Sequence, residues 1–189
     1  MMVLASKSPR RKEILDKLPV DYRVISSDMD EKKITADNPV KLSKKLAEAK
    51  GLKVSNNSKE YVLAADTVVS FNGVTLGKPT NSEHCRDMLM KLSANKHQVI
   101  TGVSLCLNGD VVYTFHVITW VYFRPLSNSL INWYISTKEP FDKAGGYGIQ
   151  GKGGVFVEKL EGCFYNVMGL PLSRTAELLG HHGLIDWGK

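Results

Sequence analysis

Apolar and polar positions follow two different periods along the chain, one typical of strands and one typical of helices. Residues 2–5 (MVLA) and 61–71 (YVLAADTVVSF) are nearly continuous apolar runs, which indicate buried strands. Within residues 39–50 and 82–92, apolar side chains instead recur every three or four positions, as on one face of a helix. Segments of the two kinds interleave, so the sequence predicts an α/β fold with a mixed sheet and flanking helices.

Turn residues predict two hairpins. Asn72-Gly73 is a strong hairpin signal, because both residues tolerate the left-handed backbone of a tight turn, and Asn108-Gly109 repeats it. We therefore expect Val74–Leu76 to return against the strand before it, and residues 99–107 to pair with 111–123. Hairpins add antiparallel neighbours, so the sheet is expected to be mixed.

Capping residues mark the helix boundaries. Proline follows a capping residue at Ser8-Pro9 and at Asn38-Pro39, which indicates two helix starts, and Gly51 is expected to end the second helix near Lys50. Further helices are predicted at 130–136 and 172–179, and short strands at 22–26, 155–157 and 164–167. No proline- or serine-rich linker divides these elements, so residues 1–189 are expected to form a single domain, with room for two lobes.

The composition is that of a globular protein with an excess of positive charge. The net charge of +6 favours an anionic partner, such as a nucleotide or a nucleic acid. No run of 18 apolar residues offers a membrane helix, and Lys7 interrupts any signal-peptide core, so we expect a cytoplasmic protein with no membrane partner. The three cysteines are widely spaced, which argues against a disulfide framework or a zinc site.

The segment from Ser6 to Arg11 leads from a strand end directly into a helix start. The unpaired N–H groups of a first helical turn attract anions. Arg10 and Arg11 lie in that turn, where cations oppose the helix dipole, and a phosphate held between them and the backbone would explain both. Ser6, Arg10 and Arg11 are therefore candidate phosphate ligands, and a basic, solvated turn is the alternative.

Two charged residues lie within apolar patterns. Asp66 sits in the middle of the 61–71 strand, where an acid is costly to bury unless it binds a metal or pairs with a cation. If that strand lies at the edge of the sheet, alternation would instead point Asp66 at solvent. Lys50 ends the apolar stripe of the 39–50 helix, and an ammonium that reaches out to water would explain it as well as a functional role.

Three other segments carry weaker signals. Lys78, between a glycine and a proline, comes near the strand acid if the first hairpin folds back, although most such lysines are simply solvated. Residues 28–33 gather carboxylates around Glu31, which can hold Mg²⁺ or can form a polar loop. Residues 144–154 contain six glycines but match neither a P-loop nor a dinucleotide fingerprint, and the amide of Gln150 can read a base edge.

Taken together, these segments resemble the Maf family of nucleotide pyrophosphatases. The matching pieces occur in the family's order and span about residues 3 to 173. They are LASKSPRRKEIL, the pair Asp30-Glu31, LAEAK ending at Lys50, AADTVV, LGKP, HQVITGVS, EPFDKAGGYGIQG and GLPLS. The resemblance implies a fold related to the ITP pyrophosphatases, with two lobes around a cleft. It also implies attack of water on the α-phosphorus of a nucleoside triphosphate, with release of pyrophosphate.

The resemblance also implies roles for individual residues. Asp66 would be the general base and would engage the metal, Glu31 would be a second metal-side carboxylate, and Lys50 and Lys78 would neutralise phosphate charge in the transition state. Ser6, Arg10 and Arg11 would hold the phosphates, and Thr67 and Gln150 would position the substrate. A divalent metal, Mg²⁺ or Mn²⁺, is expected because it screens a triphosphate and activates water. A homodimer is expected at the level of the family.

The glycine-rich segment resembles the branch of the family that acts on dTTP and UTP, so a pyrimidine preference is expected. The chain departs from the family pattern at Ala64 or Ala65, where glycine is frequent, and at Gly146, where alanine is frequent. Gly51 stands where alanine is common, which is expected to shorten the helix. The family is associated with removal of non-standard nucleotides and with arrest of septum formation.

The same residues also allow other interpretations of the function. A non-catalytic nucleotide or nucleic-acid binding regulator of cell division would use the same positive charge, but no aromatic nucleic-acid motif, zinc finger or basic tail supports nucleic acid as the partner. A binding protein would not need Asp66. A cell-division regulator would keep its effect when Lys50 or Lys78 is replaced, and a phosphomonoesterase would release orthophosphate in place of pyrophosphate.

Overall fold

The computed structural model describes residues 1–188 and contains a mixed sheet of seven strands. The strand order is β2-β1-β3-β5-β6-β7, and β4 also pairs with β3. The strands are β1 (Met2–Leu4), β2 (Tyr22–Val24), β3 (Val62–Phe71), β4 (Val74–Leu76), β5 (Lys96–Leu107), β6 (Asp110–Phe123) and β7 (Val157–Glu161). The β1–β2 and β1–β3 pairs are parallel and the others are antiparallel, as predicted for a mixed α/β fold.

Six α-helices and four short 3₁₀ helices flank the sheet in the described part of the chain. The α-helices are α1 (Pro9–Leu15), α2 (Pro39–Ser55), α3 (Ser82–Leu92), α4 (Asn128–Ser136), α5 (Phe164–Met168) and α6 (Leu172–His181). The 3₁₀ helices are η1 (Glu31–Lys33), η2 (Glu139–Asp142), η3 (Ala144–Gly146) and η4 (Lys152–Phe156). None of the helices among residues 1–188 is long and apolar enough to cross a membrane.

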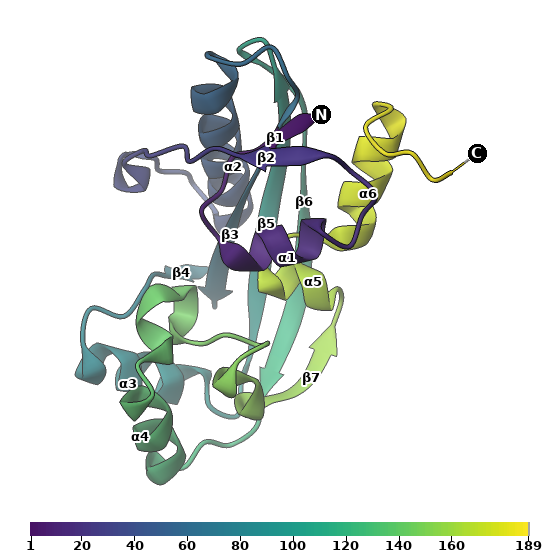
Figure 1. The fold of residues 1–189 in the computed structure, drawn as a ribbon. Helices are drawn as coiled ribbons and strands as arrows, with labels where there is room; N and C mark the ends of the chain where they lie inside the picture. Colours follow the sequence, from purple (N-terminus) through teal and green to yellow (C-terminus); the bar gives the residue numbers. More distant parts are fainter. Residues whose placement is uncertain (189) are drawn as a thin grey trace.

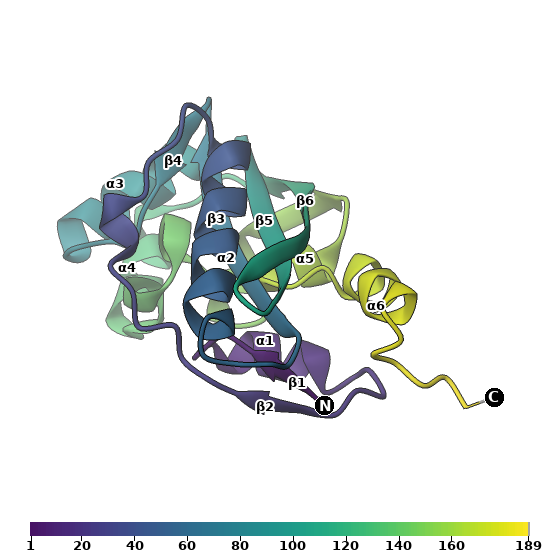
Figure 2. The same ribbon diagram turned by 90° about the horizontal axis from the view of Figure 1, so that it is seen from above.

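Alternation along β3 sends successive side chains to opposite faces of the sheet. Val62 and Ala64 pack with Val54 of α2 on one face, and Figure 2 shows α2 lying along β3 and β5. Leu63 and Ala65 belong to the core on the other face, which α1, α5 and α6 cover. Both faces of β3 are therefore buried, which explains its nearly continuous apolar sequence.

The long strands β5 and β6 run through two lobes (Figure 1). The lobe with both chain ends contains the two cores just described. The other lobe has a separate core, in which Val99 and Val121 of the sheet pack against α3, α4 and the glycine-rich segment. One continuous sheet joins the two lobes.

One edge of β3 is interrupted where the lobes meet. Strand β5 pairs with β3 along its length, from Val62 to Ser70, and so occupies one edge. Strands β1 and β4 therefore share the other edge, where β1 pairs with Val62–Leu63 and β4 with Val69–Phe71. Between them, residues 64–68 have no strand partner on that side within residues 1–188. Asp66 lies in this gap.

Both hairpins and several helix caps form as predicted. Asn72 and Asn108, together with the glycines that follow them, adopt the left-handed conformation that tight turns require. Asn38 caps α2 through its side chain, and Ser127 caps α4. The prediction that Ser8 caps α1 is wrong with respect to its side chain, which makes no capping bond; its backbone N–H donates to Ser6 Oγ at 3.1 Å.

The prediction that Gly51 ends the second helix is wrong. Helix α2 continues to Ser55, and Gly51 is buried within it. A β-carbon at this position would lie 2.6 Å from Cys106 Sγ of β5. The glycine therefore provides close packing of helix on sheet in place of a C-terminal cap, a use of glycine that local sequence does not distinguish from helix termination.

Two short strands were also placed wrongly. Residues 164–167 form part of α5, and the last strand is Val157–Glu161, not 155–157. A short apolar run does not by itself separate a strand from a buried helical turn. In the structure, Gly169 has a φ of 120° and ends α5, and Asn166 is fully buried at the centre of a hydrogen-bond network.

Candidate active site

A buried carboxylate, a buried ammonium and a half-exposed carboxylate meet at the gap in β3. Asp66 and Lys50 are each 7% exposed, and Lys50 Nζ donates a short hydrogen bond to Asp66 Oδ1. The same ammonium lies 2.9 Å from Glu31 Oε1, whose side chain is 55% exposed. The predicted residues Asp66, Lys50 and Glu31 therefore form one contact group, contributed by β3, α2 and η1.

The position of each member follows from its element. Asp66 has the same parity on β3 as Ala64, so it points to the face that α2 covers. Lys50 lies in the buried stripe of α2 with Leu46, Ala47 and Val54. Both non-functional alternatives are therefore wrong. Asp66 does not face solvent on an edge strand, and Lys50 does not reach out to water.

Burial and neighbouring charges act in opposite directions on the Asp66 carboxyl. Removal from water raises its pKa, Glu31 raises it further, and the positive charges of Lys50 and Arg11 lower it. Burial is the largest of these effects, and the net pKa of Asp66 is raised. A carboxylate with a raised pKa is a stronger base than an exposed one.

Arg11 ties the strand–helix turn to two other parts of the chain. Its Nε donates to the Gly169 carbonyl at 2.8 Å, Nη2 donates to Thr67 Oγ1 at 3.2 Å, and Nη1 donates to Ser6 Oγ at 3.4 Å. Thr67 follows Asp66 on β3 and so points to the opposite face, toward α1. Burial lowers the pKa of Arg11, and the Asp66 charge acts against this effect. The structure thus joins Ser6, Arg11 and Thr67.

Thr67 leads into a buried polar network that the sequence analysis did not identify. Its hydroxyl is 3.0 Å from that of Thr101, which donates to the Asn166 carbonyl at 2.9 Å. The Asn166 amide donates to the Val99 carbonyl and to Thr119 Oγ1, each at 3.0 Å. These polar residues lie on four separate elements, so no local signal could have joined them. They fix α5 on the sheet beneath Arg11.

Arg10 is held less firmly than its neighbour. Its only ion pair in the described residues joins Nη1 to Asp142 Oδ2 of η2 over 3.8 Å, and its side chain is part-exposed. This long contact is weak in water. Arg10 therefore spans from α1 to the glycine-rich lobe and keeps guanidinium donors available for an anion.

Lys78 and Gln150 lie on the other side of the gap and are exposed. Within residues 1–188, neither side chain makes a hydrogen bond or an ion pair, and no contact joins Lys78 to Asp66. Their backbones are fixed more firmly. The amide of Gly145 in the glycine-rich segment donates to the Gly77 carbonyl at 3.0 Å. The segment that carries Gln150 and the one that carries Lys78 are therefore joined.

Glu139 organises the rest of the glycine-rich segment. Its carboxylate accepts hydrogen bonds from Tyr134 Oη at 3.0 Å, from the Lys152 amide at 2.9 Å and from the Gly153 amide at 3.2 Å. These donors lower the pKa of Glu139. Gly151 has no room for a side chain, because a β-carbon there would overlap the Glu139 carboxylate. The glycines at this point thus serve internal packing.

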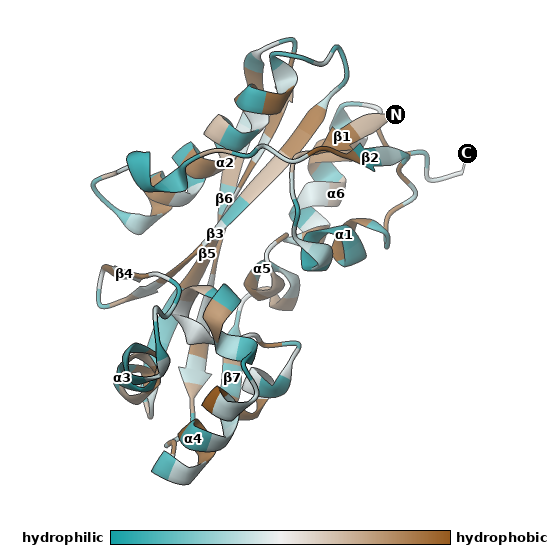
Figure 3. Ribbon diagram, turned by 60° about the vertical axis from the view of Figure 1, so that its left-hand side comes forward, coloured by the Kyte–Doolittle hydropathy of each residue, from teal (hydrophilic) through white to brown (hydrophobic). Residues whose placement is uncertain are grey.

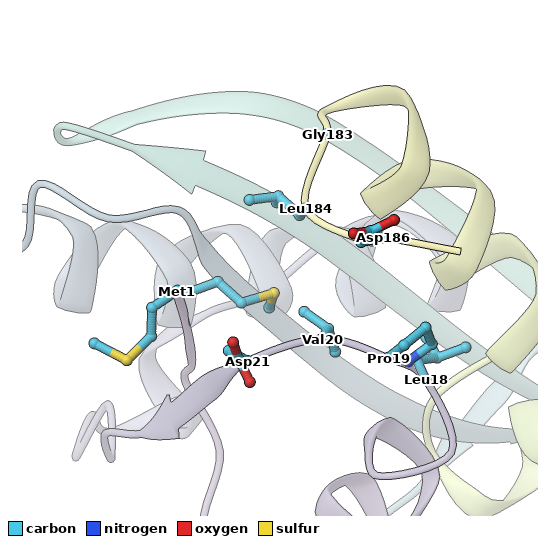
Figure 4. Close-up of a pocket in the computed structure, with 9 residues that line it drawn as sticks. Met1, Leu18, Pro19, Val20, Asp21, Gly183, Leu184 and Asp186 are labelled. Atoms are coloured by element: carbon cyan, nitrogen blue, oxygen red, sulfur yellow. The ribbon is translucent and has the colours of Figure 1, made fainter. Parts of the chain in front are cut away.

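A cavity of about 560 Å³ lies elsewhere, between the first residues of the chain and the segment after α6 (Figure 4). Its lining includes Met1, Val20 and Leu184, with the carboxylates of Asp21 and Asp186. Two carboxylates would repel phosphate, so this cavity does not suit the chemistry at the gap.

Figure 3 shows apolar colour along most of the central strands, whereas α3 is largely polar.

The carboxylates at the gap fit a magnesium-type site. Mg²⁺ prefers oxygen ligands, and proteins often supply only one or two carboxylates while water and substrate phosphates complete the shell. Asp66 and Glu31 contact the same ammonium, so their oxygens already converge. The described residues contain no group of three or more histidine, cysteine or acidic side chains that could hold a metal alone.

Comparison with known proteins agrees with the fold and the arrangement of the motifs. A structure of a HAM1 protein from Coxiella burnetii superimposes with a TM-score of 0.55 over 96% of this chain and 100% of that chain, at 14% identity, which shows that the two proteins share a fold.

Sequence comparison is more specific. The chain is 46% identical over 188 residues to a dTTP/UTP pyrophosphatase of Thermosipho africanus, covering 100% of this chain and 96% of the relative. It is also 46% identical to a dTTP/UTP pyrophosphatase of Pyrococcus furiosus, covering 95% of each chain. The family model for Maf-like proteins matches residues 1–182. The chain belongs to the Maf family.

Proposed function

We propose that this protein is a nucleoside triphosphate pyrophosphatase that hydrolyses dTTP and UTP to the monophosphate and pyrophosphate. The observation that carries the proposal is the buried Asp66 carboxylate bonded to the Lys50 ammonium, with the positive charge of Arg11 also acting on that carboxyl. The group combines a base with cationic groups for phosphate, which is what attack of water on a phosphoanhydride requires. Family membership and the names of full-length relatives support the substrate class.

In the proposed reaction, a water oxygen attacks the α-phosphorus and the Asp66 carboxylate accepts the proton that the water loses. The bond between the α-phosphorus and the bridging oxygen breaks, and pyrophosphate leaves with the bond's electron pair. Lys50 and Lys78 neutralise the charge that develops on the phosphate oxygens. Ser6, Arg10 and Arg11 hold the phosphates, and Thr67 keeps Arg11 in place through its hydroxyl.

We propose that a divalent cation, Mg²⁺ or Mn²⁺, is held by Asp66 and Glu31 together with water and substrate phosphate oxygens. When bound, such a cation screens the triphosphate charge and lowers the pKa of a bound water. Removal of metal with EDTA should abolish pyrophosphate release, and excess Mg²⁺ should restore it. Activity that persists after exhaustive chelation would contradict the metal requirement.

The pyrimidine preference is proposed to reside in the glycine-rich segment. Gln150 is exposed and without a side-chain partner in the described residues, so its amide is free to bond a base edge. The resemblance of this segment to the dTTP/UTP branch of the family supports the assignment.

We also propose a cytoplasmic location, because nucleoside triphosphates are intracellular compounds.

We also propose a homodimer formed through β6. Strand β7 pairs with β6 only from Trp120 to Phe123, so in the described part of the chain the preceding residues of β6 have no strand on the side away from β5. Val111, Val112 and Tyr113 are exposed there. Such an edge can pair with a second copy of itself. Light scattering should give a dimer mass that Val112→Lys reduces to that of a monomer.

Product identity tests the central proposal. The purified protein is incubated with Mg²⁺ and, separately, with dTTP, UTP, CTP, GTP and ITP, and the products are identified by chromatography. We expect monophosphate and pyrophosphate, formed fastest from dTTP or UTP. In Asp66→Asn the rate should fall by about 10²- to 10⁴-fold, the usual contribution of a general base.

Other outcomes separate the alternatives. Binding of a nucleotide without turnover, with either Mg²⁺ or Mn²⁺, would point to a binding protein, and Asp66→Asn should then bind anions more tightly. Release of orthophosphate alone would indicate a phosphomonoesterase. An Asp66→Asn variant with wild-type turnover would remove Asp66 from the mechanism.

A further inference from the structure

A histidine and a tyrosine form an isolated polar pair inside the core of the glycine-rich lobe. His97 of β5 is fully buried and Tyr147 is 5% exposed. A hydrogen bond of 2.7 Å joins His97 Nε2 to the Tyr147 hydroxyl. Phe123 packs edge-on against both rings, at centroid distances of 4.9 and 4.7 Å. The surroundings are otherwise apolar, so the two groups depend on each other for hydrogen bonding.

The pair is costly as a packing solution. His97 Nδ1 is buried and has no hydrogen-bond partner in residues 1–188. A buried polar atom without a partner destabilises a fold, and two apolar side chains of similar shape would avoid that cost. The hydrogen bond fixes the orientation of the Tyr147 side chain, which apolar packing alone does not do.

Tyr147 lies at the centre of the glycine-rich segment, so its orientation fixes the segment's path. Gly145 and Gly146 precede it with φ values of 71° and 73°, and both pack closely. A β-carbon on Gly145 would lie 2.9 Å from Val69, three residues after Asp66 on β3. One on Gly146 would lie 3.2 Å from Pro79, next to Lys78. The segment is thus seated on the strand that carries the candidate base and on the turn that carries a candidate phosphate ligand.

Glu139 also binds this segment, through the Lys152 and Gly153 amides, but those bonds do not join the segment to β5. Lys78 and Gln150 are exposed and make no side-chain contact in the described residues, so their placement depends on their backbones. Those backbones are joined to each other through Gly145 and Gly77. The hydrogen bond between Tyr147 and His97 then attaches these two joined segments to β5, one of the two strands in the middle of the sheet.

We propose that His97 and Tyr147 are positioning residues for the nucleotide substrate. By anchoring the glycine-rich segment to β5, they hold Gln150 and Lys78 at a fixed place relative to Asp66. The inference rests on the proposed function, because it assumes that Gln150 contacts the base. It assigns a role to two residues that touch neither the reacting atoms nor the substrate.

Tyr147→Phe tests the proposal because it removes the hydroxyl and leaves the ring. We expect KM for dTTP to rise by about fivefold, the equivalent of one hydrogen bond, with a smaller change in kcat. The preference for dTTP over CTP should fall by a similar factor. His97→Phe should give the same changes, because it also removes the hydrogen bond, and the double variant should be no worse than either single one.

Leu179→Val in α6 is the matched control, since it removes buried apolar volume in the other lobe, away from the glycine-rich segment. It should lower the melting temperature without changing KM or base preference. If Tyr147→Phe behaves in the same way, the pair is only structural and the proposal is overturned.

Hydrogen exchange provides a readout that does not depend on catalysis. In Tyr147→Phe, the amides of residues 144–153 and 77–78 should exchange faster, whereas in Leu179→Val they should not. Unchanged exchange in both segments would overturn the positioning role even if the kinetics changed. If the wild-type protein releases no pyrophosphate but the exchange result holds, the proposed function fails while the anchoring of the segment stands.

Discussion

The two sides of the gap in β3 are built in different ways. On the side of α1 and α2, the polar side chains bind one another: Lys50 meets Glu31 and Asp66, and Arg11 meets Ser6, Thr67 and Gly169. On the other side, Lys78 and Gln150 have no side-chain partners within residues 1–188, and only their backbones are fixed. The polar side chains on the side of α1 and α2 thus contribute both to the stability of the fold and to the proposed reaction. Lys78 and Gln150 can contribute to the reaction alone.

Lys50→Met should have the largest effect, because it affects both properties at once. The change leaves Asp66 and Glu31 without their shared cation, so kcat/KM should fall by about 10²- to 10³-fold. The free energy of unfolding should fall by about 3 kcal/mol, as expected when one partner of a buried pair is lost. Urea denaturation and pyrophosphate release measure the two effects, and a variant that loses activity with full stability would remove the difference between the two sides.

Lys78→Met sharpens the comparison because it makes the same chemical change on the other side of the gap, where the lysine has no side-chain partner in the described residues. We expect kcat/KM to fall by about 10²-fold, again through lost charge neutralisation. The free energy of unfolding should stay within about 0.5 kcal/mol of wild type, since the side chain is exposed and makes no contact. A loss of stability as large as that of Lys50→Met would show that Lys78 has a partner.

A pair of glycine substitutions tests the two sides through their backbones. A β-carbon at Gly102 would overlap the Ser43 backbone of α2, so Gly102→Ala should displace the helix that carries Lys50. It should cost about 1–3 kcal/mol, the usual range for overpacking, and lower kcat. Gly77→Ala is the matched control, because nothing lies within 4 Å of the added carbon. Thermal unfolding with parallel assays should separate the two variants.

The smallest expected effect is a pH dependence of stability that arises from His97, the buried partner of Tyr147 in the glycine-rich segment. Burial lowers the pKa of His97 from 6.5 to about 4, so the folded protein keeps this histidine neutral. In the unfolded chain it binds a proton below about pH 6.5, and stability is therefore complete above that pH and falls as the pH drops toward 4. By pH 5.5 the loss should be about 1 kcal/mol.

Tyr147 is the titratable group that faces His97, and it stays protonated throughout this range because burial raises its pKa. Chemical denaturation between pH 7 and 5 measures the effect. His97→Phe should lose this part of the pH dependence, and an unchanged slope in that variant would mean that other groups produce it.

The elements that could be predicted from the sequence are those with local signals. The asparagine–glycine turns set both hairpins, and the caps Asn38 and Ser127 set two helix starts. The prediction for Gly51 was wrong because its reason lies in Cys106, 55 residues further along the chain, which packs against it. Local patterns do not carry such contacts.

The same distinction applies to the candidate site. The mismatch between Asp66 and its apolar strand, and between Lys50 and its apolar stripe, could be read locally, because a charge in a buried pattern stands out. Glu31 could not be separated from an ordinary polar loop by its spacing. The network of Thr101 and Asn166 depends on pairing across the fold, and its hydroxyl and amide groups carry no distinctive local pattern.

The bond from Arg11 to the Gly169 carbonyl has a consequence for how the protein is made. The two residues are 158 positions apart, so Arg11 cannot reach its final position until Gly169 has been synthesised. Strand β1 likewise waits for β3, with which it pairs in parallel. A nascent chain therefore has an unfinished site until Gly169 has been added. Chains truncated before residue 169 would lack one of the three hydrogen-bond contacts that hold Arg11, so the complete site is restricted to chains that extend past this residue.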